Sequence, residues 1–356
     1  MPCGLQNCLK RYGVKVGMGE PFAPNELKIA VIGGGTGSFT LLSALKDHTS
    51  QIAAIVNMAD DGGSTGVLRD ELGVLPPGDV RQCLVALSDS PKIRDLFNYR
   101  FDNGTFGGHS FGNLFLTALE KTTGSFAEAI DTASEILRVN GTVIPATFDD
   151  VRLEMTWAGE EPVTLSGQRV ISAEPYELDP RKAVLSLTPR PSANPMAIKA
   201  IEQADLVVIA PGGLYTSLGP LLVIDGIGDA LRRTAAKVVY VCNLVTKAGQ
   251  TRGFTVSDHA AEIERFGGGG FLDAVLYNSQ MPSSRLLERY EREDAHLVEV
   301  DSIALKKMPY NAVGGNFLGQ IVAYNAADTH LPVTRNLIRH NPVAVASVLV
   351  SLVNRT

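Results

Sequence analysis

The chain has few cysteines, and their spacing does not suggest a metal site or a disulfide scaffold. Its 356 residues include four, Cys3, Cys8, Cys83 and Cys242, and no two have a CxxC spacing. Two lie in the N-terminal tail and two in expected core elements, so neither a disulfide framework nor a zinc site is expected. A reducing, cytoplasmic environment is the simplest interpretation.

An excess of positive charge and a long apolar run are also absent. The formal net charge of −6 argues against a general binder of nucleic acid or of anionic membranes. The apolar run at 342–353 is shorter than the ~20 residues of a membrane span, and residues 1–26 lack the continuous apolar stretch of a signal peptide. The late run is better explained as a buried helix with Asn341 as N-cap and Pro342 at its first position. Neither a nucleic-acid partner nor a membrane span is expected.

What the sequence does contain is the pattern of an α/β protein. A β-branched apolar run at 28–32 leads into glycines, and a helix at 38–46 and a second strand at 52–58 follow. This order predicts a parallel sheet with a right-handed crossover. Residues 59–78 then look irregular. Four helices are expected next, at 79–87 with Asp79 as N-cap, 91–101, 111–121 and 126–139.

The middle of the chain has a different pattern. Val151–Trp157 alternates strictly between apolar and polar residues, as a half-exposed strand does. Residues 163–172 and 183–187 look similar, and together these segments predict a small β-rich subdomain. Buried strands then return, and they are expected at 206–210, 238–242 and 274–277.

The predicted fold class is a Rossmann-like, doubly wound parallel sheet with a helical elaboration and a small β-rich subdomain. The expected division is a flexible extension (1–26), a nucleotide-binding half with the helical elaboration (27–141), the β-rich subdomain (142–190) and a second α/β half completing the same core (191–356).

A glycine-rich turn, Gly33-Gly-Gly-Thr-Gly37, follows the first strand. Glycines allow the backbone to approach an anion closely, and the amides and dipole at the following helix start favour phosphate. The turn is neither a strict GxGxxG, since Ser38 occupies the third glycine position, nor a Walker motif, since no GK[ST] follows. It predicts a phosphate cradle, with a tight turn that holds no ligand as the alternative.

Two acids, Asp60 and Asp61, lie just beyond the second strand in the segment 57–65. Ligands of open α/β sheets bind at that edge. Two carboxylates together with a diphosphate are a suitable ligand set for Mg²⁺, so these acids are the expected metal ligands. A solvated turn is the alternative. No tightly bound organic cofactor is expected.

Three further segments carry candidate chemistry. Leu75–Arg81 contains Asp79 and Arg81, whose guanidinium suits a phosphate. Gly107–Asn113 is a second glycine-rich helix entry, and His109 in it suits hydrogen bonding or acid–base work. Ile209–Ser217 repeats the order of strand, glycine turn, hydroxyls and helix. Two such turns at neighbouring strand ends are expected to face one crevice.

These segments define the expected site. The candidate catalytic residues are Asp61, Asp79 and His109. The ligand-binding residues expected from the glycine turns and strand ends are Gly34, Gly35, Thr36, Gly37, Asn57, Asp60, Arg81, Asn113, Pro211, Gly212, Gly213, Tyr215, Thr216, Ser217 and Asn243.

Taken in order, the segments resemble the CofD-like superfamily, and most closely its YvcK-type branch of gluconeogenesis factors. The matching stretches are GGGTG at 33–37, ADDGGSTG at 59–66, LPPGDVRQCLVALS at 75–88, FGGHSFGNL at 106–114, APGGLYTSLGPLL at 210–222 and CNLVTKAGQTRGFTVSDH at 242–259. The resemblance spans about Lys28 to Pro342. It implies a Rossmann-like core and places further ligand contacts at Tyr290 and Arg339.

The resemblance implies two different roles. YvcK-type proteins bind UDP-sugars such as UDP-N-acetylglucosamine, and are required for growth on gluconeogenic carbon sources and for cell shape. CofD-type enzymes are 2-phospho-L-lactate transferases, which use Mg²⁺ and move a phospholactyl group from a nucleotide diphosphate-linked donor to a deazaflavin alcohol. The stretches GGSTGVLRDELGVLPPGD and TKAGQTRGFTVSDH resemble the first branch. A UDP-sugar-binding regulator is therefore the leading expectation and a transferase the alternative, with a homo-oligomer left open.

A third interpretation is an NAD-dependent dehydrogenase. The missing third glycine and the Asp-Asp-Gly-Gly sequence at 60–63 count against it.

Overall fold

A computed structural model describes residues 26–173, 178–291, 294–319 and 339–353 of the chain. The expected N-terminal extension lies almost wholly outside these described residues. None of the helices in the described ranges has the length and apolar character of a membrane span.

A seven-stranded sheet forms the centre of the fold, and all of its pairings are parallel. In spatial order its strands are β3 (Thr142–Pro145), β2 (Ile52–Val56), β1 (Ile29–Gly33), β7 (Leu206–Ile209), β8 (Lys237–Val241), β9 (Ala274–Asn278) and β10 (Asn311–Gly315). Sequence order runs outward in one direction from β1 and in the other from β7. This is the doubly wound Rossmann order, with its reversal between β1 and β7, and the predicted fold class is confirmed.

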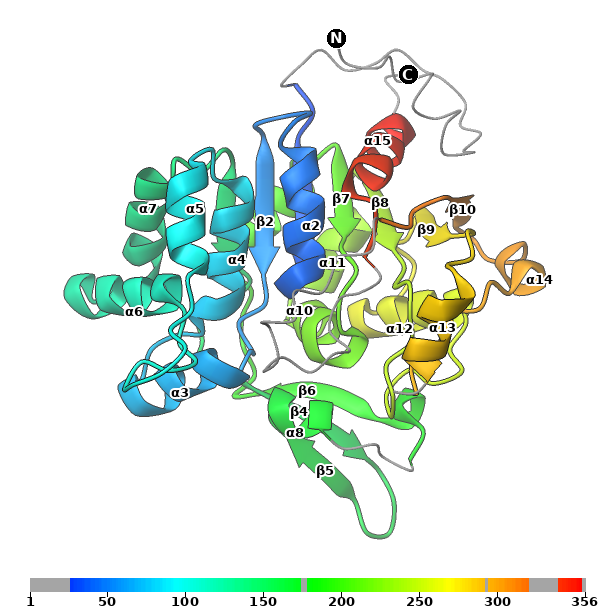
Figure 1. Ribbon diagram of the computed structural model, residues 1–356. Helices are drawn as coiled ribbons and strands as arrows, with labels where there is room; N and C mark the ends of the chain where they lie inside the picture. The colour runs from blue at the N-terminus through cyan, green and yellow to red at the C-terminus, as the bar shows by residue number, and fades with distance from the viewer. Residues whose placement is uncertain (1–25, 174–177, 292–293, 320–338, 354–356) are drawn as a thin grey trace.

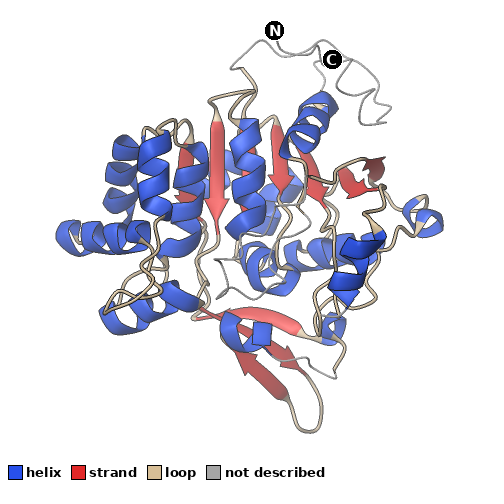
Figure 2. Ribbon diagram, viewed as in Figure 1, coloured by secondary structure: helices blue, strands red, loops and turns tan. Residues whose placement is uncertain are grey.

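Helices cover both faces of this sheet (Figures 1 and 2). Alternate residues of β1 enter different cores, because successive side chains of a strand point to opposite faces. One face carries α2 (Gly35–Leu45), α4 (Pro77–Leu87), α5 (Pro91–Asn98), α6 (Phe111–Thr123), α7 (Phe126–Leu137) and α15 (Pro342–Leu352). The opposite face carries α9 (Pro195–Glu202), α10 (Gly219–Leu222), α11 (Ile227–Arg233) and α12 (Val256–Gly267).

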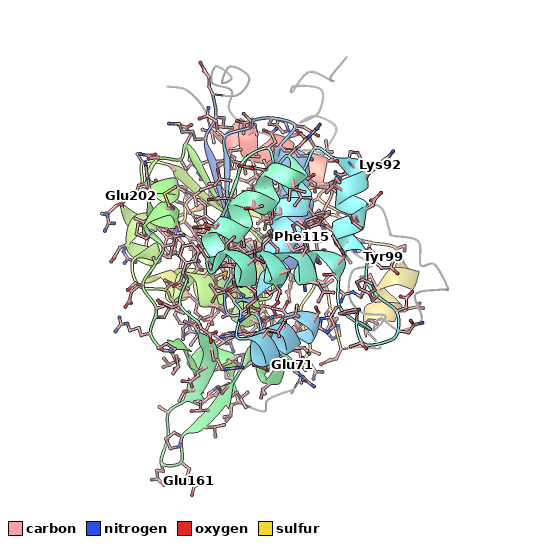
Figure 3. The ribbon with its side chains drawn as sticks, turned by 90° about the vertical axis from the view of Figure 1, so that its left-hand side faces the viewer. Glu71, Lys92, Tyr99, Phe115, Glu161 and Glu202 are labelled. Atoms are coloured by element: carbon pink, nitrogen blue, oxygen red, sulfur yellow. The ribbon has the colours of Figure 1, made fainter. Side chains whose placement is uncertain are left out.

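A small antiparallel sheet lies below the carboxyl ends of the large sheet in the view of Figure 1. Its strands, in spatial order, are β5 (Val163–Ser166), β4 (Arg152–Trp157) and β6 (Val184–Thr188). The strict alternation expected in β4 is present, because Leu153, Met155 and Trp157 are buried while the residues between them are not. Glu161 marks the tip of the β4–β5 hairpin, which points away from the body of the molecule (Figure 3). Thr142–Pro145, expected to begin the β-rich subdomain, pairs instead with β2 in the large sheet.

Several local expectations differ from the structure. The interval 59–78, expected to be irregular, contains α3 (Gly63–Leu72). Its glycines lower helix propensity, and packing of its buried residues against α4 and α6 stabilises it. Asp79 is not an N-cap: α4 begins two residues earlier, at Pro77, and the Asp79 side chain is buried. The strand expected at 163–172 ends at Ser166, because Gly167 adopts a φ of +93° and turns the chain into α8 (Gln168–Ala173).

The C-terminal helix α15 has the predicted cap. The side chain of Asn341 accepts a hydrogen bond from the Ala344 amide at 3.1 Å, and Pro342 is the first helical residue. The remaining described elements are η1 (Pro180–Lys182), η2 (Leu214–Leu218), α13 (Ser284–Glu291) and α14 (Ser302–Leu305). Neither α14 nor strand β10 was expected from the sequence.

Candidate functional site

The two glycine turns meet where the strand order reverses. One follows β1 and the other follows β7, and these strands are neighbours. A Cβ on Gly37 would lie 1.7 Å from the carbonyl oxygen of Pro211, and one on Gly33 would lie 3.1 Å from the Cβ of Ala210. Only glycines permit so close an approach. The expected juxtaposition of the two turns is therefore present.

The first turn presents the amino end of a helix to this edge of the sheet. α2 begins at Gly35, three residues earlier than expected, and Gly34 is its N-cap. The N-cap residue, Gly34, supplies no side-chain cap, the Gly35 amide hydrogen-bonds the carboxyl of Asp79, and the positive end of the helix dipole lies at this turn. Gly34, Gly35, Thr36 and Gly37 thus form the backbone arrangement that suits a phosphate.

Two acids from different elements converge beside this turn. Asp79 comes from the first turn of α4, and a Cβ on Gly34 would lie 2.1 Å from its Oδ2. Asp60 comes from the loop after β2, and its Oδ2 would lie 3.1 Å from a Cβ on Gly78, the residue before Asp79. Burial and the nearby Asp60 charge raise the pKa of the Asp79 carboxyl to about 8. Burial also raises the pKa of Asp60, against the hydrogen bond that it accepts from the Gly62 amide.

The structure separates Asp61 from this pair. Its two carboxylate oxygens accept hydrogen bonds from the backbone amides of Gln168 and Arg169 at the start of α8, at 3.1 and 2.8 Å. The expected metal pair was Asp60 with Asp61. The charge of Asp61 helps to raise the pKa of Asp60, but both Asp61 oxygens are engaged by α8, whereas the charge of Asp60 raises the pKa of the buried Asp79. Within the described residues, no group of three or more His, Cys, Asp or Glu side chains could hold a metal by itself.

Asn57 lies beside the first glycine turn with an unused donor. Its Oδ1 accepts a hydrogen bond from the Ala59 amide at 3.1 Å. Its Nδ2 is buried and has no partner in the described part of the chain, and its Cβ would be 3.4 Å from a Cβ on Gly34. A buried, unsatisfied amide is costly in a folded protein. Its position suits a hydrogen bond to a ligand in the turn.

Three of the other expected residues belong to one hydrogen-bonded chain. Arg81 donates from Nε to Oδ1 of Asn113 at 3.0 Å, and from Nη1 to Oδ1 of Asn98 at 2.7 Å. Asn113 donates from Nδ2 to Oγ of Ser64 at 3.2 Å, and Ser64 Oγ lies 2.9 Å from Nδ1 of His109. The guanidinium of Arg81 was expected to bind a phosphate, but its Nε and Nη1 donate hydrogen bonds within the protein.

The same series of hydrogen-bonded side chains contains two residues that were not predicted from the sequence. Ser64 lies within the quoted ADDGGSTG stretch, so a search of that stretch for hydroxyls would have found it. Asn98 ends α5 and had no such signal. Burial, together with the nearby charge of Arg100, lowers the pKa of Arg81 to about 10.

Asn243 holds the second glycine turn. The Gly212 amide donates to its Oδ1 at 3.1 Å, and its Nδ2 donates to the Gly212 carbonyl at 2.8 Å. Asn243 follows β8, so its side chain reaches the turn after the neighbouring strand. This reciprocal pair positions Pro211, Gly212 and Gly213.

The three residues after that turn differ in their environments. Tyr215 is fully buried, and its hydroxyl donates to Oε2 of Glu262 at 2.7 Å, so its side chain points into the core and away from the turn. Thr216 is also buried, and its Oγ1 would lie 2.4 Å from a Cβ on Gly213. Ser217 is half-buried, with its Oγ 3.3 Å from the same position.

The last two expected contacts lie late in the chain. Tyr290 is in α13, and its side chain falls outside the described residues. Arg339 lies next to His340, whose Nε2 is 3.1 Å from the carbonyl oxygen of Cys242. This places the His340 ring at the end of β8, on the residue before Asn243. Its Nε is buried and lacks a partner within the described ranges.

Comparison with known proteins finds relatives that cover most of this chain. The family model described as 2-phospho-L-lactate transferase CofD matches residues 29–318. The chain belongs to the CofD family. A Bacillus subtilis protein named "Gluconeogenesis factor" is 39% identical to this CofD-family chain over 335 residues, covering 91% of the chain and 98% of the relative. A protein of the same name from Halalkalibacterium halodurans is 39% identical over 306 residues, covering 84% and 93%.

A solved structure shares the fold. The crystal structure of a UPF0052-family protein from Bacillus halodurans has a TM-score of 0.81 and 36% identity, covering 92% of this CofD-family chain and 99% of that one. The resemblance to the gluconeogenesis-factor branch is therefore confirmed.

Proposed function

We propose that this chain binds a nucleotide diphosphate-linked ligand of the UDP-sugar type and acts as a regulatory gluconeogenesis factor. The observation that carries the proposal is the meeting of two glycine turns at the start of α2, where the N-cap residue Gly34 supplies no side-chain cap. Gly34–Gly37 and Gly212–Ser217 bind the diphosphate from its two sides, chiefly through backbone amides. Arg339 and Tyr290 address the base or the sugar, as the family resemblance implies.

A divalent cation fits the same site. Asp60 and Asp79 offer two enclosed carboxyls beside the phosphate cradle, and Mg²⁺ commonly combines one or two carboxylates with phosphate oxygens and water. The raised pKa values of the pair support this assignment, because a cation removes the cost of ionising both acids. These two residues replace the Asp60–Asp61 pair expected from the sequence as the proposed metal ligands.

Ligand binding is tested by thermal unfolding of the full chain with UDP-N-acetylglucosamine, with and without Mg²⁺. A ligand present at a hundred times its Kd stabilises the folded state by about 2.7 kcal/mol. We expect a clear rise in Tm that is larger with Mg²⁺, and a much smaller rise with N-acetylglucosamine alone. An unchanged Tm at millimolar UDP-N-acetylglucosamine would refute the proposal.

The cellular role is tested by complementation. A Bacillus subtilis strain without its own gluconeogenesis factor should regain growth on gluconeogenic carbon sources and its normal cell shape when it expresses this chain. An Asn243→Ala variant at matched expression serves as the negative control, since it removes the two hydrogen bonds that hold the second glycine turn. Failure of the wild-type chain, at normal expression, would argue against the regulatory role.

The buried acid pair favours a second candidate, a phospholactyl transferase. In that reaction the acceptor hydroxyl oxygen attacks phosphorus, its proton passes to a base, and the donor nucleotide leaves. His109, or whichever acid of the pair is not engaged by Mg²⁺, would take the proton. An assay with guanylated phospholactate and a deazaflavin alcohol separates the two candidates. Product that forms with the wild type and disappears with Asp79→Asn would establish the transferase.

A further inference from the structure

Asp61 joins two parts of the molecule that are far apart in the sequence. Its carboxylate accepts the amides of Gln168 and Arg169, which lie 107 and 108 residues further along the chain. Gly167 approaches so closely that a Cβ on it would lie 2.7 Å from Asp61 Oδ2. Its φ of +93° is also a conformation that favours glycine. The first turn of α8 is therefore built around this one side chain.

Helix α3 adds two further links to the same part of the chain. The guanidinium of Arg69, only 2% exposed, donates from Nη2 to Asp150 and to the carbonyl of Val151. Asp70 pairs with Arg152 at 2.6 Å. All three partners, Asp150, Val151 and Arg152, lie where the chain enters β4. Figure 3 shows α3, marked by Glu71, above the small sheet that ends at Glu161.

The backbone at Asp61 is firmly held. A Cβ on Gly66 in α3 would lie 2.1 Å from the Asp61 carbonyl oxygen, so the loop and the helix are in close contact. Asp60, the preceding residue, turns its carboxyl toward Gly78 and Asp79. A shift of Asp60 therefore moves the Asp61 backbone, and with it both α3 and the amides of α8.

The opposite end of α8 reaches the second glycine turn. The carbonyl of Ile171 accepts a hydrogen bond from Nε2 of Gln250 at 2.9 Å, and α8 packs against η2, the turn of helix after Gly213. The short helix thus extends from the Asp60–Asp61 loop to the wall formed after β7, across the carboxyl edge of the large sheet.

We propose that Asp61 is a positioning residue that couples the ligand site to the small sheet. Occupation of the Asp60–Asp79 pair draws the 59–61 loop toward α4, and the two hydrogen bonds from α8, together with the ion pairs from α3 to the start of β4, transmit that change to β4–β6. The small sheet is then held more tightly in the occupied protein than in the empty one. This inference rests on the proposed function, since it takes the ligand of that site as its input.

Hydrogen exchange of the full chain tests the coupling, with UDP-N-acetylglucosamine and Mg²⁺ added or withheld. In the wild type, ligand should slow exchange both at 33–45, which reports binding, and at 163–173, which reports the small sheet and α8. Asp61→Asn keeps the side chain's size and removes one acceptor. In this variant the ligand-induced slowing at 33–45 should be unchanged. The slowing at 163–173 should be about fivefold smaller than in the wild type, the size expected for a lost helix cap. Glu71→Gln, an equal charge change at an exposed position of α3, should behave as the wild type.

The outcomes separate this inference from the proposed function. Asp61→Asn with undiminished slowing at 163–173 would overturn the coupling, whereas a wild type without slowing at 33–45 would overturn the proposed ligand. In that second case, the coupling is tested by comparing hydrogen exchange of the ligand-free wild type with that of the ligand-free variant. Asp61→Asn should then speed exchange about fivefold in both 63–72 and 163–173. An effect confined to 163–173 would mean that Asp61 only caps α8.

If Asp61→Asn does not fold, Arg152→Gln takes its place. It removes the half-exposed partner of Asp70 and leaves the α8 cap intact. It should reduce the ligand-induced slowing at 163–173 by about twofold, as expected for one partly exposed ion pair. An unchanged slowing in this variant would likewise overturn the coupling.

Discussion

Replacing Asp79 by asparagine removes an ionisable group from the acid pair and keeps the shape of the side chain. Asparagine Oδ1 can still accept the Gly35 amide, which hydrogen-bonds the carboxyl in the wild type. The substitution therefore isolates the effect of charge at this position. In the absence of a divalent cation, we expect it to stabilise the protein at alkaline pH.

The sign follows from the raised pKa. An acid whose pKa is higher in the folded protein than in the unfolded chain takes up a proton on folding. The contribution of Asp79 to the free energy of unfolding is therefore about zero below about pH 4. It becomes increasingly unfavourable up to about pH 8 and is constant above that. A rise from 3.8 to about 8, at about 1.4 kcal/mol per pKa unit, sets an upper limit of about 6 kcal/mol. Because Asp60 shares in the titration, the expected gain for Asp79→Asn at pH 8.5 is about 2 kcal/mol.

Urea unfolding at pH 5.5, 7.0 and 8.5 in EDTA measures this effect. The difference in unfolding free energy between Asp79→Asn and wild type should grow with pH, while Mg²⁺ should stabilise only the wild type. Asp95→Asn, at an exposed position of α5, is the matched control and should show no such trend. A difference that does not change with pH, or a variant less stable than wild type at pH 8.5, would refute the reasoning.

Three substitutions test the assignment of the remaining site residues. Gly37→Ala places a Cβ 1.7 Å from the Pro211 carbonyl oxygen, so it should destabilise the protein by about 2 kcal/mol or more and abolish ligand-induced stabilisation, as thermal unfolding will show. Tyr215→Phe removes the hydroxyl bonded to Glu262, so it should cost about 1–3 kcal/mol in urea unfolding with no change in ligand affinity by calorimetry. Asn243→Ala removes both hydrogen bonds to the second glycine turn, so it should weaken ligand binding about tenfold in the same calorimetric titration.

Matched variants make these results decisive. Gly159→Ala adds a Cβ with no contact closer than 3.8 Å and should be neutral where Gly37→Ala is not. Asn243→Asp keeps the acceptor for the Gly212 amide and should retain more affinity than Asn243→Ala. A Tyr215→Phe variant with weakened ligand binding would show that Tyr215 contributes to the site after all.

Much of the fold follows from short-range patterns. The β-branched run ending at Gly33 predicts a buried strand and a turn, and the structure has both. Asn341-Pro342 predicts the start of α15, because the cap and first-turn proline act within one helical turn. Helix α3 was missed because it lacks such short-range signals. Its glycines are poor helix formers, and its stability comes from contacts with other helices.

For the candidate site, the sequence identified the residue types but not their spatial arrangement. The sequence alone identified the two glycine turns and the acids near them, because glycine and carboxylate chemistry is a property of the residues themselves. It could not pair the acids correctly. Asp60 and Asp61 are adjacent in the sequence, yet one faces α4 and the other α8.

The sequence by itself thus determined the α/β class, the two glycine turns after β1 and β7, and the family to which the chain belongs. Only the tertiary structure decided which side chains of each turn reach the site. Tyr215 points into the core while its neighbours line the turn, and Asp79, rather than Asp61, joins Asp60. The physical reason is that a side chain's direction depends on the elements packed against it, and in the case of Asp61 that element lies more than a hundred residues away.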